Sequence, residues 1–138
     1  MKTHVEFTSN KFPSYNTEEE GVNFEAGIYG KRLAEYLQEK LPSKGIEVSC
    51  IFPEDWGWTV EIQHGSNYPL WIGCSSYNDT SDDGFLCFIE PSKPVIRRWF
   101  KKIEVREDVA RIAEAMYEIL QAESEITNIR WWNEDEVA

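Results

Sequence analysis

The feature that most constrains the fold is a change in hydrophobic period along the chain. In two segments apolar side chains recur at every second position, first at Ile46, Val48 and Cys50 and then at Trp58, Val60 and Ile62. Successive side chains of a strand point to opposite faces of a sheet, so this period predicts two half-buried strands. Two more strands are expected at 70–74 and at 85–89, the latter central because it is apolar on both faces. Their connections are too short for crossovers, which predicts an antiparallel meander.

A helical period replaces the alternation in two long segments. Apolar residues between 107 and 122 follow one helical stripe, and Glu107 and Asp108 lie where the helix dipole favours acids. An earlier helix is expected to begin near Thr17, whose spacing to Glu20 matches a capping box, and to end at Pro42. Further strands are expected at 3–7 and 126–132, and an acidic frayed tail at 133–138.

The segment 96–103 has the same helical spacing over a shorter length. Its apolar residues, Ile96, Trp99, Phe100 and Ile103, lie at i, i+3, i+4 and i+7. Its basic residues, Arg97, Arg98, Lys101 and Lys102, fall on the opposite side of the helical wheel. This predicts a short basic amphipathic helix. The whole pattern predicts a single α+β domain over residues 1–138, with a mainly antiparallel sheet of five or six strands and two long helices on one face.

Composition excludes several classes of protein. The chain has 138 residues, 41% hydrophobic, with 6 Trp, 6 Tyr and 7 Phe, which is unlike a disordered or coiled-coil chain. Fourteen basic and 25 acidic residues give a net charge of −11, so the field of the whole molecule repels nucleic acid and anionic lipid. We therefore expect no nucleic acid and no membrane as a partner. The chain shows no long apolar run and no signal-peptide pattern, which predicts a cytoplasmic protein.

Signals for a reactive centre are weak. Cys50, Cys74 and Cys87 each lie within an apolar run, which predicts reduced thiols that act as small core residues. The histidines are His4 and His64, and no GxSxG, GxxxxGK[ST] or GxGxxG motif is present. The sequence favours a protein without catalytic residues, metal or cofactor. A Cys/His pair involving His64 stays open as an alternative.

Residues 79–90 match most positions of an EF-hand calcium loop. The matching residues are Asp79, Ser81, Asp83, Gly84 and Glu90, at positions one, three, five, six and twelve. That loop lies between two helices, whereas here an apparent strand precedes it and Pro91 follows it. An acidic hairpin loop is the favoured interpretation, and calcium binding is the alternative.

Acids and tryptophans gather in the segment 53–58, PEDWGW. The favoured interpretation is structural, with Glu54 and Asp55 at the tip of a turn and Trp58 in the core. Trp56 is out of phase with the following strand, and an exposed tryptophan beside acids is a typical anchor for a protein partner. Acid–base chemistry by the two carboxylates would need a dry pocket, which adjacent loop residues seldom provide.

The basic segment is the other unusual feature of the sequence. Six basic residues and one acid, Glu104, lie between Pro91 and Arg106, a local charge of +5 in a chain whose remainder carries −16. Such a segment can hold an acidic ligand, an anionic surface or a phosphate, or it can balance acidic elements of its own molecule. The intramolecular interpretation is favoured.

Five blocks of the sequence resemble those of a family of small bacterial proteins usually described as hypothetical. The blocks are PEDWGW (53–58), LWIGC (70–74), FLCFIEPSKP (85–94), IRRWFKK (96–102) and IRWW (129–132). The resemblance covers nearly the entire chain and implies a bacterial cytosolic protein of unknown function. It carries no catalytic residue over to this chain.

Two functions from different classes remain. The favoured one is a non-catalytic acidic interaction protein that binds a basic protein partner, as an immunity protein covers a nuclease toxin, with Glu54, Asp55 and Trp56 on its binding surface. The alternative is a small enzyme or ligand-binding domain in which Arg97 or Arg98, with Lys101 and Lys102, holds an anionic ligand. Its cleft would lie between the 53–58 loop and the basic segment, lined by Trp56, Trp99 or Trp131. The sequence does not fix the oligomeric state.

Overall fold

A six-stranded antiparallel sheet organises the molecule, in the order β2-β3-β4-β5-β1-β8. The computed structural model describes residues 1–15, 30–65, 68–76 and 83–133. The strands are β1 (His4–Ser9), β2 (Val48–Glu54), β3 (Gly57–Ile62), β4 (Trp71–Ser76), β5 (Gly84–Glu90) and β8 (Ile126–Trp132). Strands β2 to β5 are neighbours in chain order, which confirms the predicted meander, and β5 lies inside the sheet as its apolar sequence indicated.

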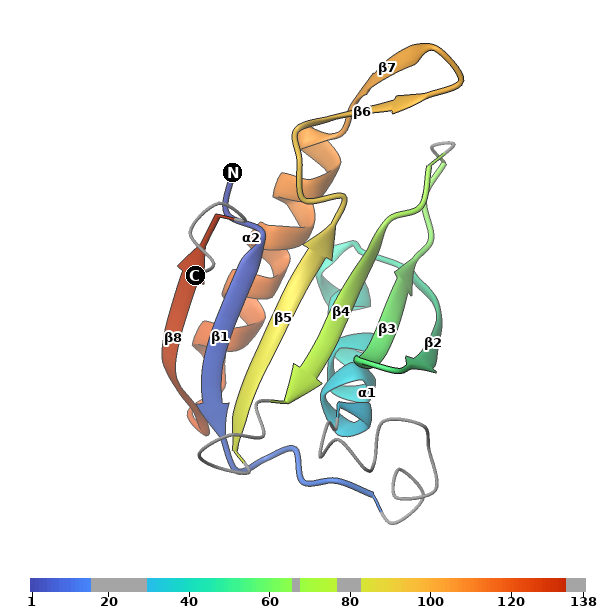
Figure 1. Ribbon diagram of the computed structural model, residues 1–138. Helices are drawn as coiled ribbons and strands as arrows, with labels where there is room; N and C mark the ends of the chain where they lie inside the picture. The colour runs from blue at the N-terminus through green and yellow to red at the C-terminus, as the bar shows by residue number, and fades with distance from the viewer. Residues whose placement is uncertain (16–29, 66–67, 77–82, 134–138) are drawn as a thin grey trace.

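Both described helices lie on one face of this sheet (Figure 1). Helix α1 (Lys31–Lys40) packs on β2, β3 and β4 and continues into a 3-10 turn, η2 (Leu41–Lys44), while α2 (Arg106–Ala122) packs on β5 and β8. Helix α2 confirms its prediction, but the expectation of two long helices is wrong for the described residues, because α1 has ten. The expected start at Thr17 lies outside the described residues. Among those that are described, no helix is both long and apolar enough to cross a membrane.

The core lies between the sheet and the two helices. Strand alternation turns one series of side chains towards the helices, and these are buried: Val5, Phe7, Val60, Ile72, Phe85, Cys87 and Ile89. The helices supply the other half of the core: Leu33, Leu37, Val109, Ile112, Met116 and Leu120. Trp58, which the sequence placed in the core, is half-buried and packs against it.

Shifts of register in β2 and in β8 alter which side chains face the helices. In β2 the shift falls between Val48, which pairs with Ile62, and Cys50, which pairs with Glu61. The extra residue of a bulge moves the following side chains to the other face, so Cys50 is exposed and its prediction as a core residue is wrong. Cys74 and Cys87 are buried as expected, and they lie opposite each other on β4 and β5.

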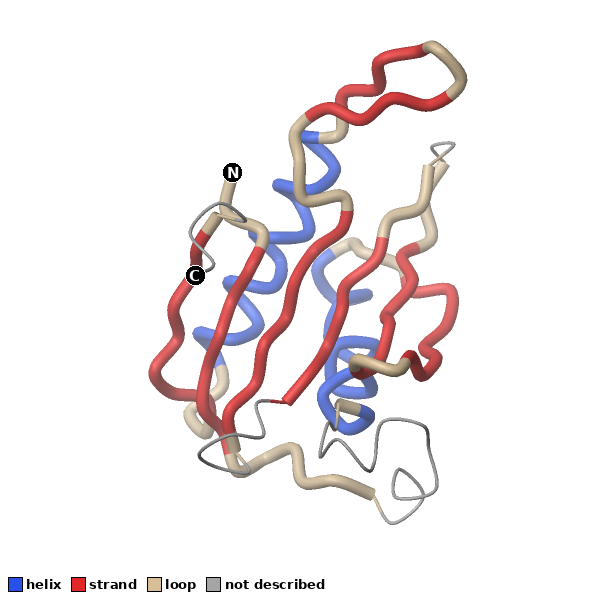
Figure 2. Tube along the Cα trace, viewed as in Figure 1, coloured by secondary structure: helices blue, strands red, loops and turns tan. Residues whose placement is uncertain are grey.

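The predicted basic helix at 96–103 is wrong. These residues form an antiparallel hairpin of β6 (Val95–Arg98) and β7 (Lys101–Glu104), which projects from one end of the sheet (Figures 1 and 2). The spacing that suits a helix also suits this hairpin, since Ile96 and Ile103 are cross-strand partners and Trp99 and Phe100 form the turn between the strands. The amide of Val105 donates to the Pro94 carbonyl at 2.9 Å and closes the base of the hairpin.

Candidate binding face of the sheet

The sheet face that the described helices leave uncovered carries a row of aromatic side chains. Cross-strand partners form one line over all six strands: Phe52, Thr59, Gly73, Phe88, His4 and Trp132. The ring centroids of His4 lie 5.9 Å from Phe88 and 6.0 Å from Trp132. At the other end, Trp56 lies 5.1 Å from Phe88 and 5.6 Å from Trp71. We call these five residues, Trp56, Trp71, Phe88, His4 and Trp132, the aromatic row.

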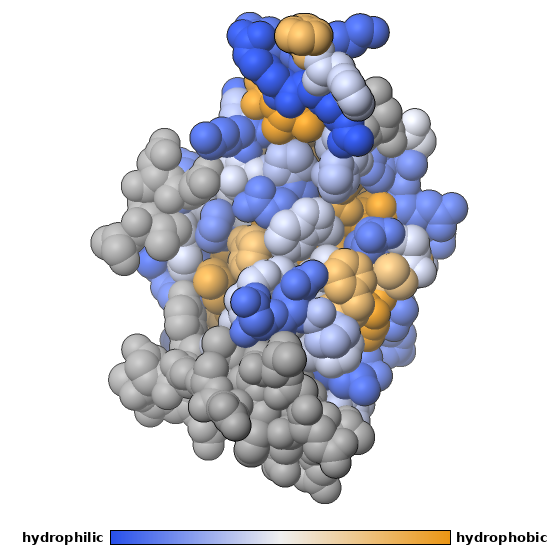
Figure 3. Space-filling model, turned by 45° about the vertical axis from the view of Figure 1, so that its right-hand side comes forward, coloured by the Kyte–Doolittle hydropathy of each residue, from blue (hydrophilic) through white to orange (hydrophobic). Residues whose placement is uncertain are grey.

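A glycine makes room for this row. Gly73 lies between Thr59 and Phe88 in the cross-strand line, and a Cβ atom at Gly73 would lie 2.3 Å from the Phe88 ring. The absent side chain therefore lets Phe88 lie over the backbone of β4, where Trp56 can pack against it. In Figure 3 pale and orange side chains gather in patches across the middle of the molecule, with hydrophilic blue ones between and around them.

The turn between β2 and β3 holds Trp56 over the sheet. It has two residues, Asp55 and Trp56, and is followed by Gly57 with φ +153°, a conformation that favours glycine. A Cβ atom on Gly57 would lie 2.2 Å from the Cys74 carbonyl oxygen, so the turn sits directly against β4. Trp56 is consequently half-buried in the aromatic row rather than exposed at a loop tip.

A cleft of about 730 Å³ opens beside Trp56 and Trp71. It is lined by Ser49, Phe52, Glu54, Trp56, Thr59, Glu61, Ile62, Gln63, His64, Tyr68, Pro69, Leu70 and Trp71. This volume lies within the usual range of ligand-binding pockets. None of these described lining residues is Lys or Arg, and the two carboxylates make the cleft anionic.

The two carboxylates lie at opposite ends of the cleft. Glu54 ends β2 and pairs with Gly57, while Glu61 lies four residues further along β3, a separation of about 13 Å along the strand. The Ser49 hydroxyl donates to Glu61 Oε1 at 2.9 Å and orients that carboxylate. A lysine or arginine can stack on a tryptophan face and pair with a carboxylate, so the cleft suits an extended basic segment better than a single small cation.

Of the residues singled out in the sequence, the structure brings Glu54 and Trp56 together in the cleft. Asp55 is exposed at the turn and does not line it. Sequence reasoning missed Glu61 and Trp71. The alternation along each strand could have indicated them. Glu61 and Trp71 alternate with the buried residues of their own strands and therefore face away from the helices.

The basic residues form a second, separate surface. Arg97 pairs across the hairpin with Lys102, and Arg98 with Lys101. All four are exposed and none lines the cleft. Trp99, at the hairpin turn, is also outside it, and Trp131 pairs with Val5 on the helix side of β1. The expected cleft between the 53–58 loop and the basic segment is therefore not what the described residues form.

The described residues bring no cysteine to the cleft. His64 lines the cleft, and its ring centroid lies 5.0 Å from that of Tyr68. Cys74 and Cys87 lie on the helix side of the sheet, and Cys50 does not line the cleft. Burial raises the pKa of the Cys74 thiol well above its ordinary value, so it stays protonated near neutral pH. This arrangement gives no support to a Cys/His nucleophile.

The candidate calcium loop is described only in part. Asp79 and Ser81 lie outside the described residues, but the stretch from Gly84 to Glu90 is the extended strand β5. An EF-hand loop instead curls so that its last residue returns to the ion. Among the described residues, no three His, Cys, Asp or Glu side chains lie close enough to hold a metal.

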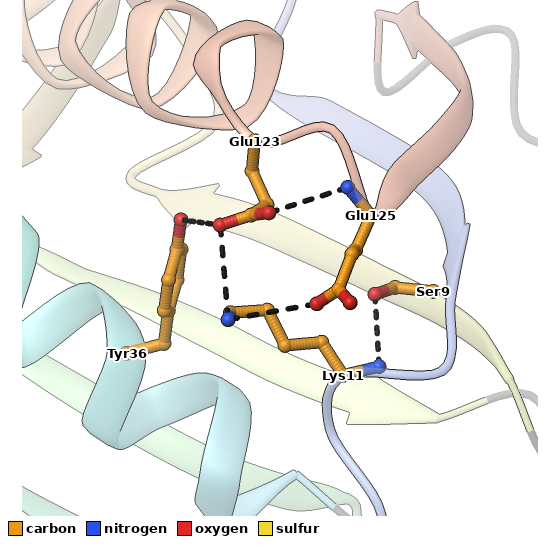
Figure 4. A network of polar contacts seen from close by, with 5 residues as sticks. All are labelled: Ser9, Lys11, Tyr36, Glu123 and Glu125. Atoms are coloured by element: carbon orange, nitrogen blue, oxygen red, sulfur yellow. Dashed lines mark hydrogen bonds and ion pairs between the residues drawn. The ribbon is translucent and has the colours of Figure 1, made fainter.

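A polar cluster ties α1 to the end of α2 near the start of β8 (Figure 4). The Tyr36 hydroxyl donates to Glu123 at 3.3 Å, and Lys11 Nζ lies 3.8 Å from Glu123 and 3.7 Å from Glu125. Burial and the Glu123 carboxylate raise the pKa of Tyr36 to about 12. The Glu125 backbone amide donates to Glu123 and lowers the pKa of that carboxyl. Because these groups satisfy one another, we interpret the cluster as structural.

The chain matches no family model, no curated protein and no solved structure. The resemblance to hypothetical bacterial proteins therefore stays a prediction. Fold and site together define an α+β protein with an antiparallel sheet. The face of this sheet that the described helices leave uncovered, which we call the open face, combines aromatic rings with carboxylates.

Proposed function

We propose that this protein is a non-catalytic interaction protein that binds a basic protein partner in the cleft of its open sheet face. One observation carries the proposal. The stacked rings of Trp56 and Trp71, 5.6 Å apart, line a cleft whose acidic side chains are Glu54 and Glu61 and whose described lining residues include no Lys or Arg.

The chemistry of the cleft favours Arg and Lys side chains. A cation within about 6 Å of a tryptophan ring is attracted by the ring quadrupole, and the attraction grows as water is excluded. Carboxylates add charge-assisted hydrogen bonds, which are bidentate with Arg. The net charge of −11 accelerates the encounter with a basic surface. Aromatic anchors then supply the slow dissociation that charge alone does not give.

In its most specific form, the proposal is that this chain is an immunity protein, which covers a nuclease toxin. A nuclease must present a basic surface to the phosphate backbone of its substrate. An acidic protein with aromatic anchors complements such a surface and blocks access to it. The support for this form is the charge and the open aromatic face, with Glu54 and Trp56 at its cleft.

The general proposal is tested with a peptide of about ten residues rich in Arg and Lys and lacking aromatics. Titration calorimetry and the tryptophan fluorescence of the protein report binding at several salt concentrations. We expect affinity to fall as salt rises, and to fall about tenfold or more in Trp71→Ala and in Glu61→Gln. Glu114→Gln, which removes an exposed acid on α2, is the matched control and should keep wild-type affinity.

Two results would contradict the general proposal. One is the absence of peptide binding at low salt. The other is an equal loss of affinity in the Glu61 and Glu114 variants, because it would mean that the peptide senses net charge and not the cleft.

The immunity form makes a further prediction about the gene neighbourhood. A reading frame for a basic nuclease should lie beside the gene of this protein. The purified protein should abolish the activity of that nuclease at an equimolar ratio, and Trp71→Ala should need an excess. Full nuclease activity in the presence of excess wild-type protein would overturn this form and leave the general proposal standing.

A further inference from the structure

The β6–β7 hairpin concentrates locally unfavourable features at its tip. Trp99 has φ +59° and Phe100 has φ +82°, a left-handed turn that normally takes Asn-Gly. Trp99 is 83% exposed and Phe100 is fully exposed. The cross-strand pairs Arg97–Lys102 and Arg98–Lys101 join like charges, which destabilise a strand pair. Backbone strain and exposed aromatics at one site are typical of a binding element.

The chemistry of this tip complements the cleft. The hairpin offers two aromatic rings flanked by cations, and the cleft offers aromatic rings flanked by the carboxylates of Glu54 and Glu61. In Figure 3 the upper end of the molecule is mostly hydrophilic blue, with an orange hydrophobic group at its apex. Each chain therefore carries a site for a basic segment together with a basic segment that its own fold leaves exposed.

We propose that the β6–β7 hairpin of one chain inserts Trp99 and Phe100 into the cleft of a second copy, and that the exchange is reciprocal and gives a two-fold symmetric dimer. This inference rests on the proposed cation-binding role of the cleft and names an occupant for it. A basic protein partner then competes with the second copy, so that binding of the partner separates the dimer.

The position of the two elements allows both contacts to form at once. Trp71, in the cleft, pairs with Glu90 at the end of β5, and the hairpin begins five residues later at Val95. The Glu61 and Trp71 end of the cleft and the root of the hairpin therefore lie at the same end of the sheet, where Figure 1 shows the hairpin leaving the body. A two-fold axis near this end brings each hairpin to the cleft of the other chain.

The expected buried area favours the closed dimer over open chains of molecules. Two large aromatic side chains bury about 300–500 Å² when fully covered. The receiving surface buries a similar area, so a one-way contact totals about 600–1,000 Å² and the reciprocal pair about 1,200–2,000 Å². The second range is that of stable protein interfaces, whereas the first overlaps with weak contacts.

The test measures the mass of the full chain by sedimentation velocity over a concentration series. We expect a dimer for the wild type and at least about a 100-fold weaker association for Trp99→Asn/Phe100→Gly. This variant keeps the hairpin, because Asn-Gly is the preferred sequence for such a turn, so the loss of the dimer is not a loss of folding. The matched control is Tyr117→Ala, which removes a half-exposed aromatic of α2 and should remain dimeric.

A charge exchange tests which surfaces meet. Glu54→Lys/Glu61→Lys reverses the cleft, Arg98→Glu/Lys101→Glu reverses the hairpin, and each variant alone should be monomeric. In an equimolar mixture the basic hairpin of the first meets the acidic cleft of the second, and the acidic hairpin of the second meets the basic cleft of the first. Both contacts are attractive again, so we expect a heterodimer.

The outcomes separate this inference from the proposed function. A wild-type chain that stays monomeric up to about 100 μM, or a Trp99→Asn/Phe100→Gly variant that stays dimeric, overturns the inference. If that monomer still binds the Arg- and Lys-rich peptide, the proposed function stands without the dimer. If the wild type forms the dimer and the monomeric variant binds no peptide, the cleft serves self-association and the proposed function fails.

Discussion

The two faces of β5 share one backbone and differ in almost everything else. Phe85, Cys87 and Ile89 point towards the helices and are at most 1% exposed. Leu86, Phe88 and Glu90 alternate with them and are half-buried on the open face. The helix side is filled by apolar packing that holds the sheet together, whereas three rings of the open face, those of Trp56, Trp71 and Phe88, stay partly exposed. This contrast shows that one strand can contribute to the core through one face and to binding through the other.

The largest effect is expected from removing the Phe85 ring on the helix side of β5, with removal of the Phe88 ring on the open face as the comparison. Phe85→Ala leaves a cavity in the core and should lower the free energy of unfolding by about 3–5 kcal/mol. Phe88→Ala removes a half-buried ring and should cost about 1–2 kcal/mol. Urea unfolding measures both. Equal losses of unfolding free energy in the two variants would contradict the difference between the two faces, because the open face would then be packed as tightly as the core.

Gly57 and Gly73, the two glycines behind the aromatic row, test how rigidly the open face is packed. Gly57→Ala adds a Cβ atom against a backbone oxygen at a φ of +153°, and should cost about 3 kcal/mol. Gly73→Ala meets the outer edge of the Phe88 ring, which can swing away, and should cost about 1 kcal/mol while shifting the fluorescence of Trp56. A greater loss at Gly73, measured by urea unfolding, would mean that the Phe88 ring is held as rigidly as backbone.

Alkaline pH should weaken the helix side of the molecule. The pKa of Tyr36 is about 12 in the folded protein and 10 in the unfolded chain, so only the folded state keeps the proton between these values. The associated stability is present below pH 10 and is lost as pH rises towards 12. Urea unfolding at pH 9 to 11.5 should give a shallower decline for Tyr36→Phe than for the wild type. Glu61→Gln, on the open face, is the control and should keep the wild-type decline.

If stability falls as steeply with pH in Tyr36→Phe as in the wild type, the proton that only the folded state keeps is on another group. Cys74 is the next candidate, because burial raises its pKa and its stability contribution is also lost as pH rises. In that case Cys74→Ala should make the decline shallower, in the wild-type background as well as in Tyr36→Phe.

The smallest effect on stability is expected at the acid of the cleft. Glu61 is exposed, so Glu61→Gln should change the free energy of unfolding by less than about 0.5 kcal/mol. Its affinity for the basic peptide should nevertheless fall. Thermal unfolding beside the peptide titration checks both expectations. A stability loss above about 1 kcal/mol would reassign Glu61 from binding to folding.

Part of the candidate site was accessible from the sequence. The segment 53–58 indicated Glu54 and Trp56, because acids and tryptophans so close together suggest recognition. Trp71 and Phe88 could not be joined to them, since their meeting depends on which strands are neighbours and in what register. Gly73 had no sequence signal of its own. Its role appears only where Phe88 crosses the backbone of β4.

The elements with a local pattern follow from the amino-acid sequence alone: the strands of the meander, the central place of β5, and α2 with its apolar stripe. The tertiary structure sets the exposure of Cys50 and the side of the sheet that Trp131 occupies, because bulges in β2 and in β8 change the facing of the side chains that follow them. It also decided between helix and hairpin at 96–103. The spacing of the apolar residues there fits both a helix and a hairpin. The cross-strand pairing of Ile96 with Ile103, which the spacing alone does not reveal, favours the hairpin.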